Sequence, residues 1–245
     1  MYQAVFRRYE LKYLLTAKQA ERMTAAIAPY MKADAYGKTT IRNLYFDTDT
    51  YLLIRRSIEK PLFKEKLRLR SYARADENDT VFAELKRKCE GIVYKRRQAL
   101  CVSDAMDWLC GGTSHTDTQI SREIDYFLSF YKNLHPTVFL SYDRTAYYSK
   151  NDDGFRVTFD TNILARRDDL SLGADVYGTQ LLSDGTVLME IKCYGSIPMW
   201  MVKILSAERI YKTPFSKYGE AYKKLIFPSI HDKETKKTED NCFAI

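Results

Sequence analysis

Residues 63–72 read FKEKLRLRSY and place a cation at every second position: Lys64, Lys66, Arg68 and Arg70. In an extended strand, successive side chains point to opposite faces, so these cations share one face while Leu67 and Leu69 lie on the other. Such a strand fits the wall of a wet cavity whose apolar face packs outward beneath helices. It fits equally an ordinary antiparallel sheet with one solvated face. The choice depends on whether the pattern recurs.

The same alternation recurs along the rest of the chain. It predicts eight strands, at residues 6–13, 39–46, 63–72, 80–89, 92–100, 137–148, 155–162 and 186–193. At least six of them carry lysine or arginine on one face. Glu90-Gly91 is the kind of tight connection that joins antiparallel strands. Residues 166–185 read as a long loop with a small hairpin at Leu181-Leu182.

Helical spacing predicts six helices between and after these strands. They are expected at residues 17–29, 51–57, 103–110, 119–132, 198–209 and 217–227. Thr16 and Ser103 are the expected N-caps of the first and third helices. Eight antiparallel strands are enough to close a barrel. About ten cations would be intolerable in a dry core, but they suit a tunnel that holds a polyanion.

The predicted fold is therefore α+β, an eight-stranded antiparallel β-barrel with a tunnel and with helices packed on the outside. We expect one domain over residues 1–228 and a charged, disordered tail over residues 229–245. The charge balance agrees, because 39 Lys and Arg against 32 Asp and Glu give a net charge of +7. That moderate excess suits a phosphate-rich partner.

Other features of the sequence indicate a cytoplasmic protein. Five cysteines, odd in number and without CxxC spacing, are typical of reduced thiols. No signal peptide is recognised at the start, and no apolar run approaches the roughly 18 residues of a membrane span. The three histidines lack metal-ligand spacing, and Gly37-Lys38-Thr39 lacks the earlier glycine of a P-loop. Tyrosines share few faces with the cations, which disfavours specific nucleic-acid binding.

The strands carry motifs that are informative through their order and spacing. Along the chain they are RYELKY (8–13), LRLRSY (67–72), ELKRK (84–88), GIVYKRR (91–97), YDRTAY (142–147), FRVTFDTN (155–162), LMEIK (188–192) and PFSKY (214–218). Over residues 6–227 the chain resembles the catalytic domain of the vacuolar transporter chaperone (VTC) complex. That domain is the polyphosphate polymerase branch of the triphosphate tunnel metalloenzymes.

The resemblance implies a tunnel whose side chains contact phosphates. The candidate catalytic residues are Lys12, Arg68, Arg70, Lys86, Arg144 and Arg156. The candidate substrate-binding residues are Glu10, Lys95, Arg97, Lys192, Ser216 and Lys217. Glu190 is the candidate ligand of Mn²⁺ or Mg²⁺, because a carboxylate among cations is well explained by a hard ion that bridges it to phosphate. Arginine adds a planar fork of donors suited to phosphate oxygens.

Three functions are compatible with such a tunnel. The leading hypothesis is a polyphosphate polymerase, a transferase that moves the terminal phosphoryl group of ATP onto a polyphosphate chain. The alternatives are a metal-dependent triphosphatase or polyphosphatase, and a polyanion-binding domain without catalysis. Arg8 stands where many tunnel enzymes have the first of two carboxylates, which disfavours the triphosphatase and cyclase branches. Pro214 and Phe215 precede Ser216 where a basic residue is usual in the polymerases, and Lys212 is the candidate replacement.

Overall fold

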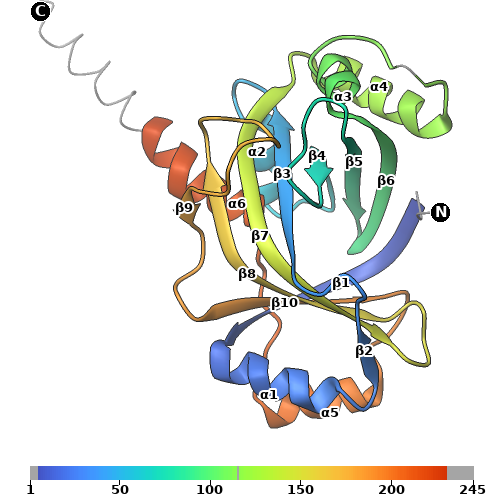
Figure 1. Cartoon of the computed structure of the whole chain (residues 1–245), viewed down its shortest axis with the longest axis vertical. Helices are drawn as coiled ribbons and strands as arrows, with labels where there is room; N and C mark the ends of the chain where they lie inside the picture. The colour runs from blue at the N-terminus through green and yellow to red at the C-terminus, as the bar shows by residue number, and fades with distance from the viewer. Residues whose placement is uncertain (1–4, 115, 231–245) are drawn as a thin grey trace, which may run out of the picture.

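The computed structural model describes residues 5–114 and 116–230 (Figure 1). Within these ranges ten antiparallel strands form one sheet, and eight of them close into a ring. Around the ring the strands follow one another as β7 (His135–Ser149), β3 (Thr39–Asp47), β4 (Phe63–Ser71), β5 (Thr80–Cys89), β6 (Ile92–Cys101), β1 (Val5–Thr16), β10 (Thr186–Cys193) and β8 (Arg156–Arg166), which pairs with β7 again. These are the eight predicted strands, so the predicted barrel is confirmed.

Two short strands extend the sheet beyond the ring and were not predicted. β2 (Met31–Ala33) pairs with the end of β7, and β9 (Thr179–Gln180) pairs with β8. The predicted hairpin at Leu181-Leu182 is wrong, because the chain there pairs with β8 and the Leu181 N–H donates to the Ile163 carbonyl at 2.8 Å. Pieces of two or three residues are too short to show an alternation of period two.

Two pairs of helices cover opposite ends of the barrel from outside. α3 (Val102–Leu109) and α4 (Gln119–Tyr131) pack on β4 and β5, whose outward Leu67 and Leu69 are fully buried beside Trp108 and Phe127. α1 (Ala17–Ile27) and α5 (Met199–Ala207) lie side by side over β1, β8 and β10 (Figure 1). β4 therefore has the apolar outer face that was predicted for residues 63–72.

Of the two predicted N-caps, one is confirmed and one is wrong. Thr16 does cap α1, in a capping box with Gln19. The N-cap of α3 is Cys101 rather than Ser103, because β6 runs directly into this helix. The Ser103 N–H donates instead to the Glu77 carbonyl at 3.0 Å.

The last helix packs on the inner face of the ring, unlike the two pairs of helices on the outside. α6 (Lys217–Ala221) continues through a π-helical turn, Tyr222–Ile226, and the helical chain reaches residue 230. Its buried Tyr218 and Ala221 contact side chains such as Tyr45 and Tyr142, which share their faces with the cations. α2 (Leu52–Ile58) joins the same cluster through Ile54. These two helices therefore close one end of the barrel interior.

The remainder of the predicted tail, residues 231–245, lies outside the described residues. Across the described ranges, the helices are all too short or too polar to cross a membrane.

Candidate functional site

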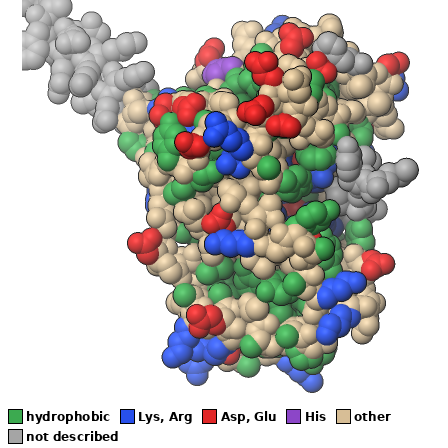
Figure 2. Space-filling view, in the orientation of Figure 1, with side chains coloured by type: hydrophobic (Ala, Val, Ile, Leu, Met, Phe, Trp, Pro, Cys, Tyr) green, Lys and Arg blue, Asp and Glu red, His purple; other side chains and the backbone are tan. Residues whose placement is uncertain are grey.

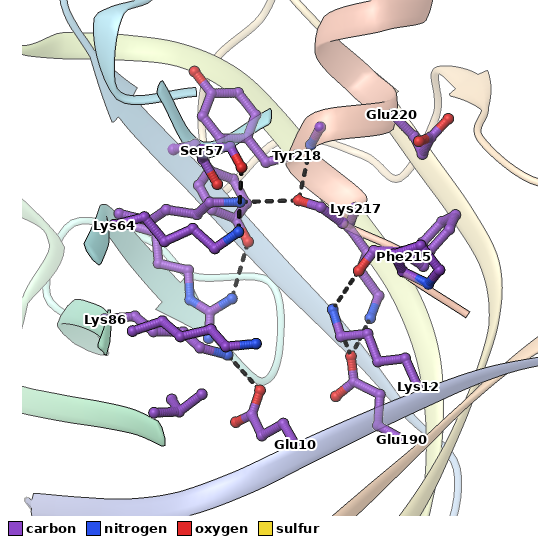
Figure 3. Close-up of a pocket in the computed structure, with 18 of the residues that line it drawn as sticks. Glu10, Lys12, Ser57, Lys64, Lys86, Glu190, Phe215, Lys217, Tyr218 and Glu220 are labelled. Carbon is purple, nitrogen blue, oxygen red and sulfur yellow. Dashed lines mark hydrogen bonds and ion pairs between the residues drawn. The ribbon is translucent and has the colours of Figure 1, made fainter. Parts of the chain in front are cut away.

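The ring encloses a cavity of about 480 Å³ whose wall is strongly cationic (Figure 3). Its lining, taken from the described residues, contains fifteen lysines and arginines but only three glutamates. On the outer face shown in Figure 2, basic side chains lie in small groups separated by acidic, apolar and polar ones. On that face the basic side chains are thus more dispersed than on the cavity wall.

Most of the predicted site residues meet in this cavity. The lining includes Glu10, Lys12, Arg68, Arg70, Lys86, Lys95, Arg144, Glu190, Lys192, Ser216 and Lys217. They come together because the strand registers place them opposite one another, with Lys12 beside Glu190 and Lys86 beside Lys95. Figure 3 shows Lys86 pointing toward Glu10, and Lys12 toward Glu190.

Two predicted site residues are not among the side chains that line the cavity. Arg97 lies over the ring of Phe82 at 4.5 Å and donates to the Tyr72 hydroxyl at 2.6 Å. Arg156 lies over the ring of Tyr148 at 4.4 Å and pairs with a carboxylate of the β2–β3 connection. Both arginines are on inward-facing positions of their strands, but their side chains are held by neighbours.

Glu84 binds four cations on the inner face of the barrel, although it does not itself line the cavity. It is fully buried on β5, and Arg68 donates to it through Nε at 2.9 Å and Nη2 at 2.7 Å. Arg97 donates at 2.8 Å, Lys95 at 3.2 Å, and Arg70 lies 3.8 Å away. Burial alone would raise the pKa of Glu84, but Arg70, Lys95 and Arg68 hold that pKa well below its ordinary value. Glu84 is therefore ionised and fixes the cations of β4 and β6.

Asp160 plays the same structural part on the opposite wall. It is fully buried on β8 and accepts both ends of the Arg144 guanidinium at 2.6 Å. Lys217 of α6 donates to it at 2.6 Å as well. Burial alone would lower the pKa of Lys217, but Asp160 and Glu190 raise that pKa above its ordinary value. This bidentate geometry holds the guanidinium in one orientation.

Glu190 is surrounded by cations but held more loosely. It lies 3.2 Å from Lys217, 3.4 Å from Lys192, 3.5 Å from Arg144 and 3.6 Å from Lys12. Burial would raise the pKa of Glu190, and these four cations, Lys217 first, lower it well below the ordinary value. The carboxylate is therefore ionised. The distances from its oxygens to the four cations are at or beyond the range of strong hydrogen bonds.

The sequence profile of the VTC domain matches residues 7–226. The chain belongs to the VTC domain family. No curated protein matches the chain. Two solved structures share its fold. A candidate adenylate cyclase from Bacillus halodurans is 15% identical, with a TM-score of 0.55 over 87% of this chain and 96% of that one. A candidate adenylyl cyclase from Hippeastrum, described as having a dominant triphosphatase activity, is 16% identical, with a TM-score of 0.51 over 86% and 93%.

The VTC domain fits a divalent ion that is bound jointly with phosphate. Among the residues that the structure describes, no three His, Cys, Asp or Glu side chains are grouped as a metal site. Glu190 and Glu10 nevertheless both line the cavity, and their charges interact. Mg²⁺ is commonly held by one or two carboxylates together with substrate phosphates and waters. The loosely held oxygens of Glu190 suit that arrangement, whereas those of Glu84 and Asp160 are occupied by guanidinium groups.

Six further lysines line the cavity and were not among the site residues predicted from the sequence, although Lys212 was named as a candidate replacement for the basic residue before Ser216. They are Lys60, Lys64, Lys66, Lys88, Lys212 and Lys223. Lys66 donates to the Ser216 hydroxyl at 2.9 Å, and Lys64 donates to the Ser57 carbonyl at 3.2 Å. Burial and the neighbouring cations, Lys12 and Lys86 foremost, lower the pKa of Lys66 well below its ordinary value. This VTC domain thus does place Lys212 at the cavity.

Lys64, Lys66 and Lys88 carried a sequence signal, because they recur at every second position together with the other cavity-facing residues of β4 and β5. The other three lysines lie outside the long strands, where no period of two can indicate their direction. Lys60 follows α2, Lys212 lies in the connection before α6, and Lys223 is on the last helix. In the VTC domain, tertiary structure alone identifies Lys60 and Lys223, whereas Lys212 had been named from the family resemblance.

Proposed function

We propose that this VTC domain transfers the terminal phosphoryl group of ATP to a polyphosphate chain held in the cavity. The observation that carries the proposal is the excess of fifteen lysines and arginines over three glutamates on the cavity wall. Such a wall is unstable as a dry core but binds a polyanion through charge-assisted hydrogen bonds. The number of cations supports a ligand with more phosphates than a single triphosphate.

The arginines of the wall would bind the phosphate oxygens. Arg68 and Arg144 are held by the buried carboxylates Glu84 and Asp160, so their remaining N–H groups have a fixed direction before substrate arrives. Phosphoryl transfer depends mainly on positioning and on stabilising the charge of the transferred group. A preorganised cationic wall supplies both.

The reaction needs no nucleophile from the protein. An oxygen of the terminal phosphate of the chain attacks the γ-phosphorus of ATP, the bond to the β-phosphate oxygen breaks, and ADP leaves with its negative charge. Glu190 and Glu10 would hold Mn²⁺ or Mg²⁺, which when bound neutralises charge on phosphate oxygens. Lys217 and Lys12, both beside Glu190, would contact the oxygens of the transferred group.

Hydrolysis is the second candidate function. It is favoured by the carboxylate of Glu10, which lies in the cavity and could orient a water, and which accepts from Lys86 at 2.5 Å. Arg8 lies 3.5 Å from the same carboxylate and adds positive charge at that position. A carboxylate paired with two cations is a weak base, which favours transfer to a phosphate over transfer to water.

The test is to incubate the purified protein with ATP and Mn²⁺ or Mg²⁺ and to separate the products on a gel that resolves polyphosphate from phosphate. We expect chains that lengthen with time, together with ADP. Stoichiometric release of phosphate without chains under both metals would establish hydrolysis. Binding of polyphosphate without turnover would leave only a binding domain.

Arg8 variants sharpen that test. Arg8→Glu restores a second carboxylate on β1 and should shift the products toward free phosphate. Arg8→Gln removes the cation without adding a carboxylate, so it separates the two effects. An unchanged product ratio in Arg8→Glu would contradict the role assigned to this position.

A further inference from the structure

Asp47 connects the two helices that close one end of the barrel. It is fully buried at the end of β3 and is not part of the cavity lining. Its Oδ1 accepts the backbone N–H groups of Thr48 and Leu53, both at 2.9 Å. Its Oδ2 accepts the N–H of Ile54 at 3.0 Å and the hydroxyl of Tyr218 at 2.9 Å. One carboxylate therefore binds the start of α2 and a side chain of α6.

Tyr218 is held in this place from three directions. Besides Asp47, its hydroxyl contacts the Thr137 hydroxyl of β7 at 3.0 Å. Its ring stacks on Tyr45 of β3 with centroids 4.6 Å apart, and the Tyr45 hydroxyl accepts from Arg68 at 3.0 Å. The side chain is 1% exposed, so the ring cannot move without displacing the helix.

The residue before Tyr218 is Lys217, which points toward Glu190 in Figure 3 and also donates to the buried Asp160. Its Nζ lies 2.6 Å from Asp160 and 3.2 Å from Glu190. The connection that leads to it is exposed at Pro214 but is tied to β1, because the Thr213 N–H donates to the Lys12 carbonyl at 2.8 Å and Phe215 is buried. The contacts of Tyr218 add a second restraint from the helix side. The position of Lys217 therefore depends on both restraints, and the attachment of α6 to β3 is the one that Asp47 supplies.

We propose that Asp47 is a positioning residue that acts through the Tyr218 hydroxyl to fix Lys217 in the cavity. Neither Asp47 nor the hydroxyl needs to touch substrate. The consequence for phosphate binding rests on the proposed function, whereas the placement of Lys217 does not. Two readouts can therefore separate them.

The first readout is the reactivity of Lys217 in the full chain without ligand. Tyr218→Phe keeps the stacked ring and removes only the hydroxyl. We expect acetylation of Lys217 by an amine-reactive reagent, quantified by mass spectrometry, to rise severalfold in this variant. Exposed Lys18 on α1 serves as the internal reference. Unchanged labelling of Lys217 relative to Lys18 would overturn the proposal, whatever the protein binds.

The second readout is the affinity for inorganic tripolyphosphate by calorimetry, below the unfolding temperature of every variant. Tyr218→Phe should bind on the order of tenfold more weakly, because a charge-assisted hydrogen bond from Lys217 is misplaced. In a Lys217→Ala background the same change should have almost no effect, since the two act as one unit. An equal loss in both backgrounds would overturn the proposal.

Two further variants control for a merely structural effect. Thr137→Val removes the other partner of the Tyr218 hydroxyl and leaves the bond to Asp47 in place, so Lys217 labelling should stay near the unmodified level. Asp47→Asn should raise labelling and add little when combined with Tyr218→Phe. If Thr137→Val raised Lys217 labelling as much as Tyr218→Phe does, general destabilisation would explain both effects. The positioning role of Asp47 would then be refuted. Increased labelling in a protein that fails to bind tripolyphosphate would refute the proposed function alone.

Discussion

Glu190→Gln should change phosphate binding and metal dependence in opposite directions. Glutamine keeps the shape of the side chain and removes a charge that lies 3.2–3.6 Å from four cations. That charge also repels an incoming phosphate. A unit charge about 6 Å away, at an effective dielectric constant of about 40 for a wet cavity, contributes about 1.4 kcal/mol. Without metal, tripolyphosphate should therefore bind about tenfold more tightly to the variant.

The turnover of ATP with metal should fall in the same variant, whereas the affinity for tripolyphosphate without metal should rise. Loss of the carboxylate that would hold the ion should lower turnover of ATP at least about a hundredfold, the usual cost of removing one electrostatic element of an active site. Binding is measured by calorimetry in the presence of a chelator, and turnover is measured with Mn²⁺ and with Mg²⁺. Glu220→Gln is the matched control, because Glu220 also lines the cavity but pairs with Lys223 at 3.0 Å.

The reasoning would be refuted by equal stimulation by metal in Glu190→Gln and in the unmodified protein. Glu190 would then be a salt-bridge partner of the cavity wall. In that case the variant would lose stability, since breaking a buried ion pair usually costs about 3–5 kcal/mol. The Glu220→Gln control should retain its stimulation by metal.

Three further predictions follow from the same geometry. Burial lowers the pKa of Lys95 to about 7, despite Glu84, so tripolyphosphate affinity should fall as pH rises from 7 toward the ordinary lysine value of 10.5, with proton uptake on binding. Lys95→Arg should flatten that dependence in calorimetry with two buffers of different ionisation enthalpy, and an unchanged profile would exclude Lys95 as its source. Leu67→Ala, on the outer face of β4, should cost about 2–5 kcal/mol of unfolding free energy in urea titrations while leaving tripolyphosphate affinity nearly unchanged at low temperature. Long polyphosphate should bind more tightly than tripolyphosphate in competition assays, since each added charge-assisted contact contributes about 1–3 kcal/mol; equal affinities would contradict this.

The ring of eight strands could be predicted because each strand has one face toward the cavity and one face under helices. That arrangement keeps a clean period of two over strands of eight residues or more. β2 and β9 have three and two residues, so no period can mark them. The position of α6 inside the ring could not be predicted from the sequence either. Its apolar residues predict burial, but whether Tyr218 packs outside or inside the ring depends on Tyr45 and Tyr142, which only the closed barrel brings within reach.

The candidate site could be predicted as a set of faces but not as a set of contacts. Glu84 and Asp160 alternate in step with the cations of β5 and β8, but the sequence alone assigned them no role. Their function in the wall depends on register, since Glu84 lies opposite Arg68 on one side and Arg97 on the other. That register also explains why Arg97 is held by Glu84 and is not part of the cavity lining. An alternating pattern gives the direction of a side chain, but its partner comes from the neighbouring strand.

The distribution of carboxylates divides the cavity into two electrostatic environments. In one, Glu84 and Asp160 offset the charge of the arginines and keep them in place without substrate. In the other, Lys66 is surrounded by cations, with a hydroxyl as its hydrogen-bond partner, and its pKa falls as a result. The first environment is preorganised and favours fixed geometry at reacting phosphates. In the second, a bound anion favours the charged form of Lys66, so this environment suits a flexible chain that binds at variable positions. The combination of both environments supports the proposed transfer of a phosphoryl group to a chain.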